Sequence, residues 1–350
     1  MKKIIIEDGL SLYNKTGIGQ YTQNLYEIMQ NLGYDILMPR KYFLERISNS
    51  YLRRFLYILW VNLVFPFYIY FNQVNTVIFS NTNSPLYKLP KVKYYIVLHD
   101  LWANQFPETM GVIKKNYANF VISNIKRLAY KIITVSETVK KEIVDFYKCD
   151  ESFVKVIYNY FSFGENPKIG LSNEEQKLFL DKYDIREKEY ILSVGSINKR
   201  KNISFLIEAY KQINTDKKLV IVGRKENQEL NINNNIILTG YLNDEELKVL
   251  YKNALIFVFP SLYEGFGIPL IDAQSFGVPV LCSNIPVFRE IGGDSVEYFQ
   301  INNTNDLCIK LQYLLKNENA LKDLIKKGEE NGQTYYKDNI KKQILEVLGE

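Results

Sequence analysis

The chain has 350 residues, enough for roughly two domains and a sizeable hydrophobic core. Its 47% hydrophobic and 24% charged residues exclude a disordered or fibrous protein. The net charge of +5 is too small for dedicated nucleic-acid binding, so no nucleic acid is expected as a partner. The single histidine excludes multi-histidine metal sites. The three cysteines are odd in number and widely spaced, which indicates a reducing, cytoplasmic compartment.

Short β-branched runs alternate with helical patterns through the first half of the chain. The expected strands are Lys3–Ile6, Thr76–Phe79, Tyr94–Leu98, Lys131–Val135 and Val154–Tyr158, with helices at Gln20–Asn31 and Glu137–Tyr147. Buried strands separated by helices predict a parallel sheet covered on both faces.

The second half repeats this alternation. Its expected strands are Tyr190–Val194, Lys218–Val222, Ile236–Leu238, Leu255–Phe259 and Val278–Cys282, with helices at Ile203–Ile213, Asp244–Asn253 and Pro269–Phe276. The sequence thus predicts two doubly wound α/β domains, 1–165 and 166–350, facing a central cleft. The aperiodic segment 161–172 is the expected linker, and a last helix near 335–350 is expected to pack back on the first domain.

Residues 55–71 form one long apolar run. It is interrupted by Asn62 and Pro66 and is shorter than the roughly 20 residues of a membrane span. We interpret it as a buried core helix. The alternative is a surface that also touches membrane, where acidic headgroups would meet nearby cations. Those cations are Lys41, Arg46, Arg53 and Arg54.

Two candidate elements follow strands in the first half. Gly17 and Gly19 open a helix, where glycines let the backbone approach an anion, but position 22 is Thr, so the dinucleotide fingerprint is incomplete. His99 and Asp100 directly follow a strand, at the edge of the sheet where a site is expected. This position favours a functional role for His99.

The segment after the strand Tyr190–Val194 is basic. It contains Lys199, Arg200 and Lys201 beside a helix start, for which Asn202 is the expected cap. Arginine clamps phosphate oxygens in pairs and lysine adds a compact charge. The sequence predicts a diphosphate site here, with a solvated turn as the alternative.

The segment Pro260–Ala273 carries two glycines and two carboxylates between a strand and a helix. Gly265 and Gly267 free backbone N–H groups to face an anion or sugar hydroxyls. Glu264 and Asp272 lie eight residues apart. Two acceptors at this separation can hold two polyol groups of one ligand, and need not be a general acid and base.

Together these segments resemble the family 4 retaining glycosyltransferases, which have the GT-B fold. Pro260–Ala273 is similar to their PSxxEGFGxPxxEA signature, with Asp272 in place of the second Glu. Other resembling elements are Thr16–Tyr21, His99–Leu101, Val135–Glu137, Gly195–Asn202, Thr239–Tyr241 and Asn284–Glu290. The subgroup resembled builds bacterial O-antigens, capsules and other surface polysaccharides.

The resemblance implies a role for each site residue. Arg200 and Lys201 would neutralise the leaving nucleoside diphosphate, so neither a metal nor another cofactor is expected. Glu264 would bind donor-sugar hydroxyls, Asp272 the ribose, and His99 the donor sugar or phosphate. The remaining expected substrate-binding residues are Gly17, Gly19, Ser196, Gly265, Phe266, Gly267 and Ile268.

The expected function is therefore retaining, metal-independent hexosyl transfer from a GDP-, dTDP- or UDP-sugar, with mannose or rhamnose favoured. The acceptor would be a lipid-linked or other saccharide bound by the first domain, and the enzyme would work in the cytoplasm, at the inner face of the membrane. A non-catalytic GT-B subunit is the alternative. A dinucleotide-dependent oxidoreductase and a nucleotide-sugar epimerase fit the motifs less well.

Overall fold

The computed structural model describes residues 2–9, 17–39, 41–102, 106, 112–226 and 229–349. The chain forms two compact units. Unit 1 comprises Met1–Tyr160 with Lys337–Glu350, and unit 2 comprises Phe161–Tyr336. The sequence placed its domain boundary at 165/166, inside the expected linker.

Unit 1 is built on a parallel sheet in the order β2-β1-β3-β4-β5-β6. Chain order reverses between β1 and β3, so the topological switch point lies there. The strands are β1 (Lys3–Glu7), β2 (Asp35–Leu37), β3 (Thr76–Phe79), β4 (Lys93–Val97), β5 (Lys131–Thr134) and β6 (Val154–Val156). The switch point fixes where a ligand of this unit is expected, at the carboxyl ends of β1 and β3.

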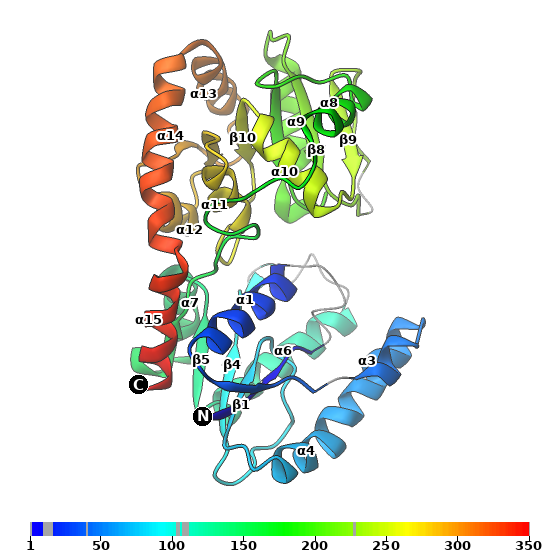
Figure 1. Ribbon diagram of the computed structural model, residues 1–350, viewed down its shortest axis with the longest axis vertical. Helices are drawn as coiled ribbons and strands as arrows, with labels where there is room; N and C mark the ends of the chain where they lie inside the picture. Colours follow the sequence, from blue (N-terminus) through cyan, green and yellow to red (C-terminus); the bar gives the residue numbers. More distant parts are fainter. Residues whose placement is uncertain are drawn as a thin grey trace. The chain divides into compact units, whose positions relative to one another are not determined.

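Helices cover the sheet of unit 1 (Figure 1). They are α1 (Gly17–Asn31), α2 (Tyr42–Glu45), α3 (Ser50–Leu59), a π turn η2 (Trp60–Val64), α4 (Phe65–Phe71), α6 (Val112–Leu128), α7 (Glu137–Tyr147), a 3-10 turn η4 (Glu151–Phe153) and α15 (Lys337–Leu348). The start of α7 is fixed by Ser136, whose side chain accepts the N–H of Val139. Helix α15 packs against α1 and β6 within the unit.

The run from α3 to α4 corrects the expectation of a wholly buried core helix. Tyr57, Trp60 and Phe65 on one face are buried in the hydrophobic core of unit 1. Phe55 and Phe67 on the other face are exposed. Figure 1 shows α3 and α4 as one long blue helix along the outside of the unit.

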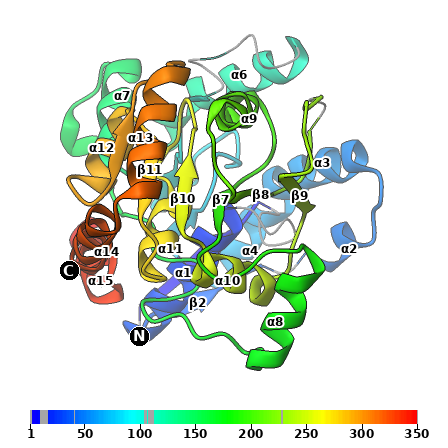
Figure 2. The ribbon, with the colours of Figure 1, turned by 90° about the horizontal axis from the view of Figure 1, so that it is seen from above.

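Unit 2 has a parallel sheet in the order β12-β11-β10-β7-β8-β9, with its switch point between β7 and β10. Figure 2 shows β11, β10, β7, β8 and β9 side by side. The strands are β7 (Tyr190–Val194), β8 (Lys218–Val222), β9 (Ile236–Gly240), β10 (Ile256–Phe259), β11 (Val280–Ser283) and β12 (Glu297–Phe299).

The helices of unit 2 begin at clear capping signals. Ser172 and Asn243 each form a capping box, with Glu175 and Glu246 respectively. The helices are α8 (Asn173–Lys182), α9 (Ile203–Gln212), α10 (Asp244–Asn253), α11 (Ile268–Ser275), α12 (Pro286–Gly292), α13 (Thr304–Lys316) and α14 (Glu318–Gly332), with 3-10 turns η5 (Lys199–Lys201) and η6 (Gln333–Tyr335). Residues of α9 and α13 pack on one face of the sheet in a single core cluster.

The predicted strands and helices all occur, with ends shifted by a few residues. The three-residue edge strands β2 and β12 escaped prediction. Both are short and only partly buried, so neither shows the apolar run that marks the central strands.

Candidate active site

The basic segment of unit 2 lies at the switch point of its sheet, at the carboxyl end of β7. Asn198 caps the 3-10 turn Lys199–Lys201 by accepting the N–H of Lys201. Asn202 occupies the expected N-cap position of α9, but in a left-handed conformation and with no side-chain cap bond. The turn thereby presents Arg200 and Lys201 next to the loop that follows β10.

Glu264, in that loop, joins the two segments. Its Oε2 lies 2.9 Å from Nη1 of Arg200, and its Oε1 lies 2.6 Å from Nζ of Lys201. The Ser261 hydroxyl donates to the same Oε1 at 2.8 Å. Three predicted site residues thus form one ion cluster, in which Arg200 and Lys201 lie 64 and 63 positions before Glu264. Ser261 was not predicted, although its place beside Glu264 in the signature was the signal that could have found it.

Burial and charge act in opposite directions on Glu264. Its side chain is 8% exposed, and burial alone would raise the pKa of the carboxyl. The cations of Lys201 and Arg200 outweigh burial and hold the pKa below its ordinary value. Glu264 is therefore ionised at neutral pH. The Arg200 side chain remains 26% exposed, which leaves it accessible to an anion.

Gly267 shapes the start of α11. Its φ of +109° is a conformation that suits glycine, and a Cβ there would lie 2.8 Å from Cε1 of Phe288. Gly265 and Phe266 are buried, and the Phe266 ring packs edge-on to Tyr335 at 5.4 Å. Ile268, half-buried, begins the helix. The loop thus reaches the helix by a turn that only glycine makes without strain.

Asp272 lies on α11, and its side chain bonds to Ser162, outside the Arg200–Lys201–Glu264 cluster. It is 3% exposed, and its Oδ1 accepts the backbone N–H of Ser162 at 2.8 Å. Burial raises the pKa of this carboxyl to about 7. The structure therefore ties Asp272 to the first residues of unit 2, and its binding of a ribose stays a prediction.

His99 of unit 1 lies at the carboxyl end of β4. Its Nε2 lies 2.8 Å from the carbonyl oxygen of Ser80, which can only accept, so Nε2 carries the proton. Burial lowers the pKa of the imidazole, which the Ser80 carbonyl and Asp100 only partly offset. The ring of Tyr21 packs edge-on at 4.9 Å. A neutral imidazole protonated at Nε2 presents Nδ1 as a hydrogen-bond acceptor.

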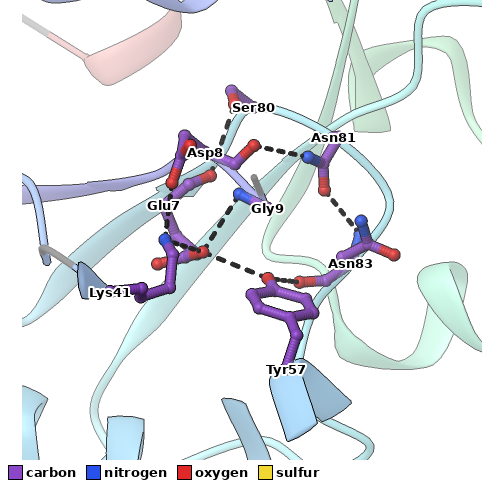
Figure 3. Close-up of polar contacts among 8 residues, drawn as sticks. All are labelled: Glu7, Asp8, Gly9, Lys41, Tyr57, Ser80, Asn81 and Asn83. Atoms are coloured by element: carbon purple, nitrogen blue, oxygen red, sulfur yellow. Dashed lines mark hydrogen bonds and ion pairs between the residues drawn. The ribbon is translucent and has the colours of Figure 1, made fainter. Parts of the chain in front are cut away.

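A second ion cluster lies at the switch point of unit 1, at the carboxyl end of β1 (Figure 3). Nζ of Lys41 lies 2.8 Å from Oε1 of Glu7 and 2.5 Å from Oδ1 of Asp8. The Tyr57 hydroxyl also donates to Glu7 Oε1, and Asn81 donates to the Asp8 carbonyl. Lys41 is buried, which corrects the expectation that it could meet lipid headgroups.

Glu7 and Asp8 are not among the predicted site residues. The available signal was their position, since two acidic residues directly follow the first buried strand. Burial alone would lower the pKa of Lys41, but the two carboxylates outweigh it and raise that pKa. Lys41 is therefore charged at neutral pH, and it partly neutralises the two acids.

The other predicted residues are placed as follows. Gly17 is exposed and Gly19 is buried at the start of α1, whereas Thr16 of the same motif lies outside the described residues. Ser196 is half-buried directly after β7.

Over the part of the chain that the structure describes, no three His, Cys, Asp or Glu side chains gather as metal ligands do. Metal independence stays a prediction.

Two parallel six-stranded sheets, each with its polar residues at a switch point, define a protein of the GT-B class. Known structures agree. The chain superposes on sucrose-phosphate synthase of Thermosynechococcus elongatus with a TM-score of 0.78 and 16% identity, covering 100% of this chain and 98% of that one. It superposes on Anabaena HepE, solved with UDP and glucose, with a TM-score of 0.71 and 14% identity, covering both chains fully. These likenesses confirm the fold.

The chain belongs to the group 1 glycosyl transferases. The family model for "Glycosyl transferases group 1" matches residues 175–331. The O-antigen chain mannosyltransferase RfbU of Salmonella typhimurium is 30% identical over 265 residues, which is 73% of this chain and 69% of that protein. The predicted family resemblance, GT-B fold and hexosyltransferase class are thereby confirmed.

Proposed function

We propose that this enzyme transfers a hexose from a nucleotide sugar to a lipid-linked or other saccharide acceptor, with retention of anomeric configuration and without a metal. The observation that carries the proposal is the Arg200–Lys201–Glu264 cluster at the switch point of unit 2. It holds two cations where a diphosphate is expected, beside a carboxylate that can accept sugar hydroxyls.

The proposed reaction breaks the bond between the anomeric carbon and the diphosphate oxygen. Negative charge develops on that oxygen, and Arg200 and Lys201 stabilise it as a metal would. The acceptor hydroxyl attacks from the same face and passes its proton to the departing phosphate. Glu264 then orients the donor sugar, and no separate protein base is required.

His99 contributes through its tautomer. Because Nε2 donates to the Ser80 carbonyl, Nδ1 can only accept a hydrogen bond. A phosphate oxygen at neutral pH offers no proton, whereas a sugar hydroxyl does. Of the two contacts expected for His99, donor sugar or phosphate, this geometry favours the sugar.

Mannose is the first candidate sugar and GDP the first candidate nucleotide, because the similar RfbU protein is named a mannosyltransferase. Its name also supports a role in O-antigen synthesis, and the name of the similar capsular polysaccharide glycosyltransferase CapM of Staphylococcus aureus supports one in capsule synthesis. For either role we propose a cytoplasmic enzyme at the inner face of the membrane. Rhamnose from a dTDP-sugar and UDP-hexoses are the other candidates. Presence of Arg200, Lys201, Glu264 and His99 weighs against a non-catalytic subunit.

The test is thermal unfolding with GDP, dTDP, UDP or NAD in excess chelator. A ligand at 100 times its Kd should add about 2.7 kcal/mol to the free energy of unfolding. Stabilisation by one nucleoside diphosphate, followed by sugar transfer from the matching donor at a rate that chelator does not change, supports the proposal. Stabilisation by NAD alone contradicts it, as does transfer that stops in chelator.

A further inference from the structure

The outer face of the helix Ser50–Phe71 is apolar and exposed. Its large side chains recur every four residues, with Tyr70 and Leu52 extending the stripe. The stripe consists of Tyr51, Phe55, Leu59, Leu63, Phe67 and Phe71, which are all exposed. We call these six residues, with Leu52 and Tyr70, the outer stripe. A soluble surface helix normally turns polar residues to this side.

The inner face shows a second stripe at the same spacing, offset by two residues. It consists of Tyr57, Val61, Phe65 and Ile69, all buried in the core of unit 1. A step of four residues exceeds the 3.6 residues of an α-helical turn, and the wider π turn at Trp60–Val64 helps keep both stripes aligned. The helix is thus apolar on two opposite faces, only one of which is covered.

The helix is long and apolar enough to span a bilayer by length and composition. The contacts that its inner face makes with the rest of unit 1 exclude a membrane-spanning arrangement. Tyr57 donates to the buried Glu7 at 3.1 Å, and Asn62 Oδ1 accepts the N–H of Leu86 at 2.9 Å. Figure 3 shows the contact of Tyr57 with Glu7. These contacts and the buried stripe hold the helix against its sheet, so only the outer stripe is available to lipid.

The segment that contains this helix carries charge of one sign. Residues 46–99 contain six basic residues and no Asp or Glu. They are Arg46, Arg53, Arg54, Lys88, Lys91 and Lys93, exposed except for the half-buried Arg53. The loop that carries Lys88 is held beside the helix, because Leu86 and Tyr87 both bond to Asn62. An apolar, aromatic stripe bordered by cations complements an anionic bilayer surface.

We propose that the outer stripe docks unit 1 on an acidic phospholipid bilayer. The helix lies in the plane of the interface, with Phe55, Phe67 and Phe71 inserted among acyl chains and with Arg53 and Arg54 at the anionic headgroups. The proposal goes beyond the location given in the proposed function, because it names the surface that docks, and docking itself requires neither donor nor acceptor. It places a group 1 glycosyl transferase where a lipid-linked saccharide would be supplied.

The test is sedimentation of the full chain with phosphatidylcholine vesicles, with and without phosphatidylglycerol. We expect binding only with phosphatidylglycerol, weakened by added salt, and release by alkaline carbonate. Phe55→Ser/Phe67→Ser/Phe71→Ser should weaken binding by about tenfold or more, because three apolar side chains no longer insert. Arg53→Gln/Arg54→Gln should weaken it and reduce its salt dependence.

The matched control is Leu178→Ser/Ile309→Ser/Tyr313→Ser, which removes apolar side chains of unit 2 that are 64, 55 and 53% exposed. It should bind vesicles as the wild type does, and circular dichroism should show that all variants fold. Equal binding by both triple variants overturns the proposal, as does binding to neutral vesicles alone or retention after carbonate. A dimer in solution that the Phe triple variant abolishes, without vesicle binding by the wild type, assigns the stripe to a second copy instead.

Discussion

Nζ of Lys201 lies 2.6 Å from Oε1 of Glu264, although the two residues are 63 positions apart. Each belongs to a loop at the carboxyl end of a strand, one after β7 and one after β10, and these strands are neighbours in the sheet. The pair is nearly buried, with side-chain exposures of 11 and 8%. A donor diphosphate would therefore meet a cation whose position is already fixed.

Lys201→Met should abolish most turnover. Removing one preorganised group that stabilises developing charge typically costs about 100-fold or more in kcat. Steady-state transfer kinetics provide the measurement. The control is Lys310→Met, which removes a more exposed lysine of unit 2 that also pairs with a glutamate, Glu297 at 2.5 Å. Wild-type kcat in the Lys201 variant would show that the site is assigned wrongly.

Lys41→Met should destabilise the protein, because it leaves Glu7 and Asp8 buried without their cation. Breaking a buried ion pair from one side costs about 3–5 kcal/mol in the free energy of unfolding. Urea denaturation measures it. Lys140→Met, which breaks the surface pair with Glu137, should cost less than about 0.5 kcal/mol.

If Lys41→Met fails to fold, a double variant still tests whether the lost stability comes from the unpaired carboxylates. Glu7→Gln/Lys41→Met removes the cation and one of its two carboxylates, leaving only Asp8 unpaired, and should recover part of the lost stability. Similar stability of the Lys41 and Lys140 variants would contradict the coupling seen in Figure 3.

Asp272 should make stability depend on pH. Burial raises its pKa to about 7 in the folded protein, above the 3.8 of the model carboxyl. A raised carboxyl pKa gives stability that is present below about pH 4 and is lost as pH rises through about 7. Asp272→Asn, which cannot ionise, should therefore gain stability relative to the wild type between pH 5 and about pH 8.

Urea denaturation of both proteins at the two pH values measures that difference. A difference that stays constant with pH would mean that Asp272 is ionised throughout. Asp338→Asn is the control, because Asp338 is an exposed carboxylate whose pKa is lowered by Lys341 and so titrates below this range.

Gly267→Ala should impair folding and donor binding together. The new Cβ would lie 2.8 Å from Cε1 of Phe288 and would force a side chain into a backbone with φ of +109°. Gly293→Ala meets open space at a φ of +52°, so it should cost only the backbone strain, about 1–3 kcal/mol. Thermal unfolding with and without the stabilising nucleotide compares them. Equal melting temperatures would show that the α11 loop tolerates a side chain.

The sequence by itself determined the two α/β units and the donor loops. Buried strands such as Thr76–Phe79 and Tyr190–Val194 show largely apolar runs. The Pro260–Ala273 signature is contiguous in sequence, so it can be identified without knowing which residues contact it. Because parallel strands end at the same edge, residues after β7 and β10 could be assigned to one site before their distance was known.

Only the tertiary structure decided which side chains pair and which faces are covered. Lys41 looked like a surface cation, yet it is buried against two carboxylates at the end of β1. Asn202 stands at the N-cap of α9, but without the side-chain bond that its residue type predicts. The run 55–71 is apolar on both sides, so its periodicity could not show that one side is exposed. Burial and pairing depend on neighbours that are distant in sequence, and a local sequence pattern does not identify those neighbours.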